Sequence, residues 1–209
     1  MPKKQVERFA IEHLLPSLPH FSVRGNLLFE RPVGKILRAF LLENSGFSAA
    51  TFYPQAFVQL LYIPSQHLTL RPGRRFPGNW KFEPERETQL AQELLNQIHE
   101  IGLRFLRAHA TAEGIVRETK ANPAVEVNPH ARQQLAYSLL LLERNEEALD
   151  ELNKILGMLN RSGDPPPWEH ALFAEVGGLK ERLMRNPREA FQTLNTWTEQ
   201  TRLKLNLPA

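Results

Sequence analysis

The sequence predicts an α+β fold: an N-terminal helix and an antiparallel β-meander, followed by an all-α stack of about three helical hairpins. Three observations support this prediction. Apolar residues near the N-terminus recur at helical spacing. Between residues 21 and 70, short apolar segments alternate with turn residues. From residue 85 onward, helical periodicity and helix start signals continue to the end of the chain.

In the first part of the chain, the pattern predicts a helix over residues 5–15, which Pro16 ends. Strands are predicted over residues 21–23, 27–29, 35–43, 51–63 and, as a short fifth strand, 67–70. The spacing within 35–43 also allows a helix. Pro54 lacks an N–H group, so we expect it at a bulge or on a sheet edge. Since no helices separate these strands, an antiparallel meander is favoured, with the first helix on one face.

Residues 71–84 form the clearest break in the sequence, because they contain three prolines and two glycines. We therefore predict a boundary between a small α+β sub-domain, residues 1–84, and a helical-hairpin sub-domain, residues 85–209.

The second part contains helix start signals at regular intervals. Helices are predicted over residues 112–120, 129–143 and 145–159, from Trp168, and from Pro187 onward, with Thr111, Asn128, Asn145 and Asn186 at their starts. Together with an apolar stripe formed by Leu90, Leu94, Ile98 and Ile101, they give about six helices in hairpins that start near residues 85, 129 and 168. Residues 163–167, Gly-Asp-Pro-Pro-Pro, are expected to form a rigid stop.

Residues 135–156 resemble a tetratricopeptide repeat. The resemblance rests on Leu135, Ala136 and Leu139 in the first helix and on Ala148, Leu152 and Leu156 in the second. Glu143 stands at the usual glycine of the turn, and Asn145 at the usual aromatic residue. Gly178 and Ala190 repeat the two alanines 42 residues later. The resemblance implies a protein-interaction surface without catalysis. A generic stack of α-hairpins is the alternative, because close packing needs small residues there too.

Composition limits the class of protein. The chain has 209 residues and no cysteine, so disulfides, thiolate metal sites and a cysteine nucleophile are excluded, and a reducing cytosol is expected. The first residues are polar, and no apolar run approaches the roughly 18 residues of a membrane span. We therefore expect neither export nor membrane insertion.

Charge is unevenly distributed. Residues 1–84 hold 11 Lys and Arg against 5 Glu, whereas residues 85–209 hold 15 against 18 Asp and Glu. A basic first half could bind an anionic partner, or it could simply be a small sheet with charged edges. Glu146, Glu147, Asp150 and Glu151 crowd the start of one predicted helix, where they favour the positive helix end and are expected to face water.

Motifs of catalysis are missing from the sequence. The seven histidines form no HExxH or HxxxH pair, and there is no Gly-x-Ser-x-Gly, Gly-x-Gly-x-x-Gly or P-loop pattern. Only two aspartates occur, Asp150 and Asp164, although many acid/base and metal sites use this residue. We expect no metal, no cofactor and no enzymatic activity.

The stretch from Arg71 to Lys81 is the strongest candidate for binding. Its candidate residues are Arg71, Arg74, Arg75, Trp80 and Lys81, which lie among Phe76 and Phe82. Guanidinium groups bind phosphate or carboxylate, and aromatic rings offer stacking faces. The alternative is a linker whose aromatic residues attach it to the helical part and whose arginines face solvent.

The leading functional hypothesis is a non-enzymatic, cytosolic and bacterial protein-binding module. One alternative is an immunity-like or defence accessory protein, because the N-terminal layout resembles small α+β domains of bacterial toxin-immunity and defence proteins. The other alternative is nucleic-acid binding through the basic N-terminal half.

Overall fold

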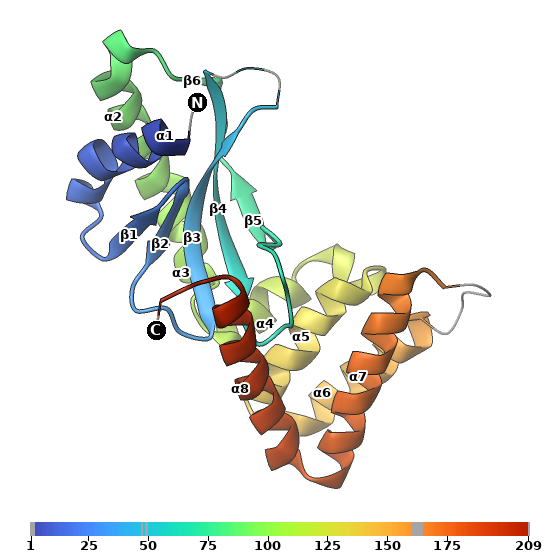
Figure 1. Cartoon of the computed structure of the whole chain (residues 1–209). Helices are drawn as coiled ribbons and strands as arrows, with labels where there is room; N and C mark the ends of the chain where they lie inside the picture. Colours follow the sequence, from blue (N-terminus) through green and yellow to red (C-terminus); the bar gives the residue numbers. More distant parts are fainter. Residues whose placement is uncertain (1–2, 47, 49, 160–164, 209) are drawn as a thin grey trace. The chain divides into compact units, whose positions relative to one another are not determined.

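The computed structural model describes residues 3–46, 48, 50–159 and 165–208. It confirms the α+β class, with an N-terminal helix, an antiparallel meander and a C-terminal helical stack (Figure 1). The chain forms two compact units. The first contains Met1–Gln59, His67–Ala108 and Leu207–Ala209, and the second contains Leu60–Gln66 and His109–Asn206. This division differs from the boundary predicted after residue 84, because residues 85–108 pack with the sheet.

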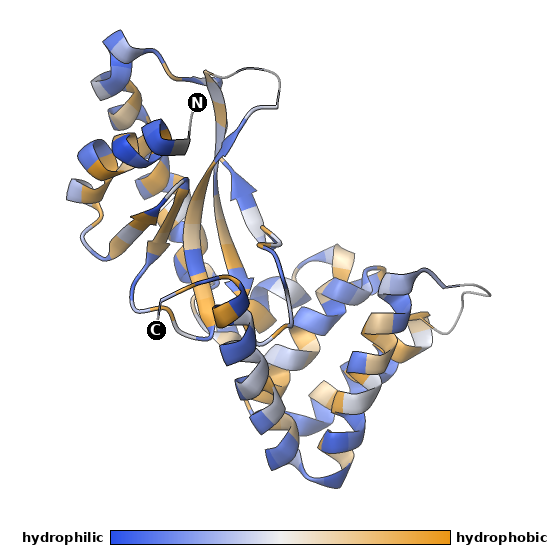
Figure 2. Cartoon of the chain, viewed as in Figure 1, coloured by the Kyte–Doolittle hydropathy of each residue, from blue (hydrophilic) through white to orange (hydrophobic). Residues whose placement is uncertain are grey.

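The sheet of the first unit is a meander. Its strands are β1 (Phe21–Arg24), β2 (Leu27–Glu30), β3 (Ile36–Asn44), β4 (Thr51–Leu60), β5 (Gly73–Arg75) and β6 (Trp80–Lys81). The strand order is β1-β2-β3-β4-β5, and β6 also pairs with β4. Gly25, with φ +63°, makes the predicted turn between β1 and β2. Figure 2 shows apolar residues running along β3 and β4, which form the centre of the sheet.

The predicted fifth strand at residues 67–70 is wrong, because these residues form a loop and the fifth strand is Gly73–Arg75. Leu70 has φ +54°, and a Cβ on Gly73 would lie 2.3 Å from the Leu70 carbonyl oxygen, so the chain turns tightly here. Hydrogen bonds to a side chain, rather than strand pairing, fix the position of this loop. Gln59 Oε1 accepts hydrogen bonds from Thr69 N (2.8 Å) and Thr69 Oγ1 (2.9 Å).

Pro54 lies where the partner of β4 changes. Phe52 pairs with Trp80 of β6, and Gln55 pairs with Arg75 of β5. Between these pairs the Pro54 carbonyl accepts a hydrogen bond from Phe76 N (2.9 Å). Pro54 therefore lies at an interruption of the pairing, as expected for a residue that has no N–H to donate.

Two helical segments complete the first unit. The first is α1 (Lys3–Phe9), which continues through a π-helical turn, η1 (Ala10–Leu14), and a 3-10 turn, η2 (Leu15–Ser17). The second runs through η3 (Pro84–Arg86), α2 (Glu87–Gln97), the π-helical turn η4 (Ile98–Gly102) and α3 (Leu103–Ala108). Val6, Phe9, Ala10 and Leu14 are fully buried. The helical periodicity predicted for residues 5–15 is therefore confirmed.

The helices of the second unit are α4 (Ala112–Lys120), the 3-10 turn η5 (Pro123–Glu126), α5 (Pro129–Leu141), α6 (Asn145–Leu159), α7 (Pro167–Arg185) and α8 (Pro187–Lys204). Thr111 caps α4, Asn128 caps α5 and Asn186 caps α8, each by accepting a backbone N–H bond. The hairpins predicted near residues 129 and 168 form α5–α6 and α7–α8. Residues 163 and 164 of the predicted stop lie outside the described residues, and its last residue, Pro167, is the first residue of α7.

Helix α5 is the centre of this unit, because it packs against α4, α6 and α8. Every residue from Leu135 to Leu140 is buried. The helix also buries three polar residues: Arg132, Gln133 and Ser138. These residues need partners inside the unit, and the partners define the candidate site described below.

The α5–α6 turn bears on the proposed repeat. Glu143 has φ +58°, Arg144 N donates to Leu139 O (3.0 Å), and Glu143 N donates to Leu140 O (3.1 Å). This is a Schellman end, whose left-handed residue is usually glycine. Ala136 and Ala148 are buried, so α5 and α6 can pack closely at both. Membership in the repeat family stays a prediction.

The Gly102 position requires glycine. An added Cβ would lie 2.5 Å from Phe40 Cε1 and 2.8 Å from Phe76 Cζ, and both rings are buried. Gly102→Ala should therefore lower the free energy of unfolding by roughly 1–3 kcal/mol. Gly177→Ala, in α7, is the control, because its Cβ would meet nothing within 4 Å. It should raise stability by up to about 1 kcal/mol. Equal denaturation midpoints for the two variants would contradict this packing.

Candidate functional site

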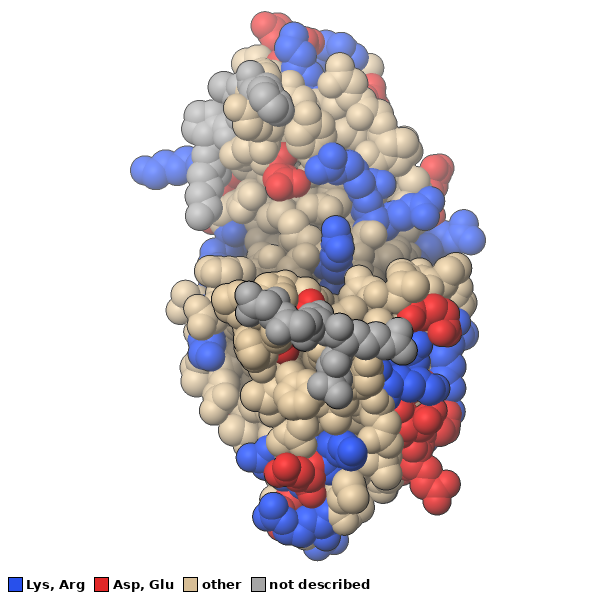
Figure 3. Space-filling model, turned by 90° about the vertical axis from the view of Figure 1, so that its right-hand side faces the viewer, with Lys and Arg blue, Asp and Glu red and all other residues tan. Residues whose placement is uncertain are grey.

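The three arginines of the predicted binding segment lie on the surface. Arg74 and Arg75 belong to β5, which ends the strand path on that side, and Arg71 is exposed just before it. Arg75 lies 3.3 Å from a Glu43 carboxylate oxygen and 4.6 Å from the centre of the Tyr53 ring. Figure 3 shows Lys and Arg side chains gathered on the face that carries β5. The three arginines are therefore exposed on or beside the same edge strand, where Arg74 and Arg75, as consecutive strand residues, point to opposite faces.

The two other predicted binding residues do not join this exposed group. Trp80 is only 6% exposed, and its Nε1 donates to the Pro77 carbonyl (3.1 Å). Phe76 and Phe82 are also buried. These rings therefore cannot stack on a nucleic acid, and they attach the segment to the sheet unit. Lys81 Nζ lies 2.9 Å from Glu83 Oε1 in an exposed ion pair.

Sequence reasoning missed a cluster in the first unit that joins α1 to α2. Glu12, His13 and Glu87 place possible metal-ligand atoms within 4.8 Å of one another. However, Arg8 NH2 lies 3.0 Å from both carboxylate oxygens of Glu87. Since a guanidinium group already neutralises this carboxylate, the cluster is better described as an ion-pair link between the two helices.

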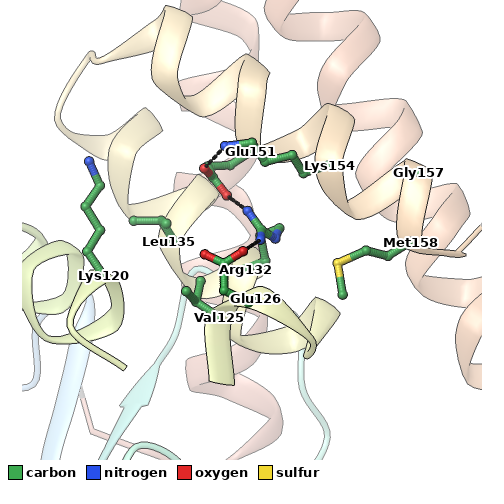
Figure 4. A pocket seen from close by; sticks show the side chains of 9 residues that line it. All are labelled: Lys120, Val125, Glu126, Arg132, Leu135, Glu151, Lys154, Gly157 and Met158. Carbon is green, nitrogen blue, oxygen red and sulfur yellow. Dashed lines mark hydrogen bonds and ion pairs between the residues drawn. The ribbon is translucent and has the colours of Figure 1, made fainter. Parts of the chain in front are cut away.

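The second unit contains a pocket of about 490 Å³ (Figure 4). Its lining residues come from α4, η5, α5 and α6 and are Lys120, Val125, Glu126, Arg132, Leu135, Glu151, Lys154, Gly157 and Met158. Figure 4 shows the Arg132 guanidinium between the carboxylates of Glu126 and Glu151. A pocket that combines a few charged groups with apolar walls is the common form of a ligand site.

The two carboxylates that bind Arg132 differ in exposure and distance. Arg132 is 6% exposed, and its NH1 donates to Glu151 Oε2 over 2.6 Å. Its NH2 donates to Glu126 Oε2 over 3.2 Å. The side chain of Glu151 is 11% exposed, whereas that of Glu126 is 75% exposed. Arg132 therefore has one buried, short ion pair and one longer, part-buried ion pair with an exposed carboxylate.

The expectation that Glu151 faces water is therefore wrong, although Glu146, Glu147 and Asp150 are exposed. A charge is buried at low cost only when it is paired, and Arg132 supplies the pair from the facing helix. The two residues are 19 positions apart, so neither a motif nor helical spacing could identify them. A charged residue inside the apolar pattern of α5 was the available signal.

Two lysines complete the charged lining. Lys154 Nζ lies 2.6 Å from Asp150 Oδ2 and 2.8 Å from Glu151 Oε1, and these hydrogen bonds raise the pKa of Lys154. Lys120 Nζ lies 3.0 Å from Glu147 Oε2. Hydrogen bonds from Arg144 and Lys120 lower the pKa of Glu147. Three cations and two carboxylates line the pocket, and two further carboxylates, Glu147 and Asp150, pair with its lysines from outside the lining.

A second polar cluster links α5 to α7. Glu175 Oε1 accepts hydrogen bonds from Gln133 Nε2 (2.6 Å) and Tyr137 Oη (2.8 Å). Burial raises the pKa of Glu175, and the two hydrogen bonds only partly offset this effect. Burial also raises the pKa of Tyr137. Burial in this cluster therefore favours the protonated form of Glu175 more than water does.

Comparison of the chain with known protein families, curated proteins and solved structures finds no match. Among the described residues, no helix combines the length and the apolar character needed to cross a membrane.

The raised pKa of Glu175 predicts a pH dependence of stability. In the unfolded chain this carboxyl ionises near pH 4.5, and in the folded chain it ionises at a higher pH. Stability should therefore fall as pH rises from the unfolded pKa to the folded pKa. The Glu175→Gln variant cannot ionise, so it should not lose stability in this way as pH rises. Its side-chain oxygen can still accept the hydrogen bonds from Gln133 and Tyr137.

The free energy of unfolding, measured between pH 4 and pH 7, should increasingly favour the Glu175→Gln variant as pH rises. Glu181→Gln, exposed on the same helix, serves as the control and should follow the parent. A parent protein that gains stability over the glutamine variant toward pH 7 would contradict the assignment.

Proposed function

We propose that the protein is a non-enzymatic, cytosolic protein-binding module whose binding surface is one end of the helical unit. This surface comprises η5, the start of α5, the end of α6 and the start of α7. Because successive helices run antiparallel, the starts of α5 and α7 and the end of α6 lie at the same end. One observation carries the proposal: exposed Val127 and Trp168 accompany a pocket with a buried arginine at this end.

The exposed apolar residues give the proposal its energetic basis. Val127 is 78% exposed, and Trp168 is 47% exposed. The Trp168 ring lies 5.3 Å from the His130 ring, which holds the indole against the start of α5. Tryptophan and arginine contribute disproportionately to binding energy at protein interfaces, and exposed apolar patches often mark such interfaces. Neither exposed residue contributes to the core of the unit.

The charge of the pocket indicates the chemistry of the partner. Its lining includes three cationic side chains, Lys120, Arg132 and Lys154, so a partner segment that presents a carboxylate can pair with a cation there. An immunity-like role, in which the protein blocks a partner by covering it, would use the same surface.

Nucleic-acid binding is the second candidate, and exposed Arg71, Arg74 and Arg75 favour it. Two observations place it second. Trp80, Phe76 and Phe82 are buried and offer no stacking faces. Charged residues on a strand at the edge of a sheet also prevent that edge from pairing with other chains, so the arginines have a role without a ligand.

The proposal predicts that Trp168 determines the affinity for a protein partner. The immobilised chain should capture a protein from a nuclease-treated lysate of the source organism. The dissociation constant of that protein should then increase at least about tenfold for Trp168→Ala, as for other interface tryptophans.

Met184→Ala is the matched control, because Met184 is an exposed apolar residue (66%) at the other end of α7. Its dissociation constant should stay within about twofold of the parent. Equal weakening by both variants, or capture that disappears with nuclease, would contradict a protein-binding surface at this end.

A further inference from the structure

We propose that the Arg132 pocket binds a carboxylate group carried on a small apolar body, and that Glu126 occupies the place of this carboxylate until the ligand arrives. The inference rests on the proposed function, because the ligand would be a residue of the protein partner. Glu126 and the ligand would compete for the same arginine.

The two ion pairs of Arg132 differ in length and in the exposure of the carboxylate. The bond to Glu151 is 2.6 Å long and buried, and it holds the guanidinium in place. The bond to Glu126 is 3.2 Å long, and the Glu126 side chain is 75% exposed. Because Glu126 is largely in water, it can leave Arg132 and be solvated, so an incoming carboxylate can replace it at lower cost than it could replace the buried Glu151. The buried pair would remain.

Arg132 has more N–H donors than its two ion pairs use. A guanidinium group has five N–H bonds arranged for paired contacts with a carboxylate. The hydrogen bonds to Glu151 and Glu126 use one from NH1 and one from NH2. Its Nε is buried and has no hydrogen-bond partner among the described residues. NH1 and NH2 therefore each keep one further N–H bond with which the group can bind a second carboxylate.

The pocket has an apolar part beside Arg132. Val125, Leu135 and Met158 line it, and Figure 4 shows Met158 extending from α6 toward Arg132. Gly157 has no side chain, and a Cβ there would meet nothing within 4 Å. The volume of about 490 Å³ is sufficient for one amino-acid residue. An apolar residue with a free carboxylate therefore fits both parts of the lining.

Movement of Glu126 away from Arg132 would change the charge of the pocket lining. With Glu126 turned away, the lining has three cations, Lys120, Arg132 and Lys154, and a single carboxylate, Glu151. The charge of the lining then becomes more positive by one unit, while Glu147 and Asp150 still pair with Lys120 and Lys154 from outside the lining. Such a site attracts anions, and Glu126 competes with them as a tethered carboxylate.

The experiment is a calorimetric titration of the full chain with three probes. N-acetyl-leucine carries an α-carboxylate on an apolar side chain, and N-acetyl-leucinamide is its uncharged counterpart. N-acetyl-glutamate α-amide carries the carboxylate on a side chain. We expect N-acetyl-leucine to bind and the leucinamide not to bind. Stronger binding of the glutamate probe would also support the carboxylate site and would assign its ligand to an acidic side chain.

Two variants test the role of Glu126. Glu126→Gln should bind the carboxylate probe about tenfold more tightly, because it removes one charge-assisted bond that competes with the ligand. Glu118→Gln is the matched control. Glu118 pairs with Arg117 on α4 and is not part of the lining, so this variant changes the net charge equally. It should bind within about twofold of the parent.

The proposal is overturned if the acid and the amide bind equally, if neither binds, or if the two variants change affinity to the same extent. The titration requires no protein partner. A failed titration would therefore reject the carboxylate pocket while the Trp168 surface remains open to the capture experiment, and a failed capture would not alter the titration.

Discussion

The buried hydrogen bond between Tyr62 and Ser138 joins two segments that are 76 residues apart. It is 2.7 Å long, and both residues are fully buried. Ser138 Oγ donates its hydrogen to the Gln134 carbonyl (2.6 Å), so Tyr62 must be the donor in the bond to Ser138. This bond attaches the segment Leu60–Gln66, which begins at the last residue of β4, to the helical unit, and Thr201 Oγ1 donates a second bond to the Ile63 carbonyl (3.5 Å).

Helix α5 carries further buried polar side chains that bind neighbouring elements of the helical unit. Arg132 binds η5 and α6, while Gln133 and Tyr137 bind α7. A helix surrounded by others is usually apolar on all sides, and each polar group inside it must find a partner. A buried ion pair adds little net stability compared with an apolar pair of similar size. This comparison supports a recognition role for Arg132 rather than a purely structural one.

Local features of the structure could be predicted from the sequence. Asn128 and Asn186 cap their helices as expected, because capping depends on a few neighbouring residues. Features that depend on residues far apart in the sequence could not be predicted. Gly73–Arg75 and Trp80–Lys81 both pair with β4, so a Pro- and Gly-rich segment becomes part of the sheet, and Trp80 is buried. In the same way, Glu151 faces Arg132 rather than water because α5 and α6 pack together.

A double-mutant cycle on Tyr62 and Ser138 tests most directly whether polar links of α5 hold the helical unit together. Tyr62→Phe removes the donor, Ser138→Ala removes the acceptor, and the double variant removes both. The account predicts a coupling free energy of about 1 kcal/mol from denaturant unfolding, with the double variant no less stable than Ser138→Ala. Strictly additive effects of the two substitutions would show that this bond contributes nothing and would contradict the account.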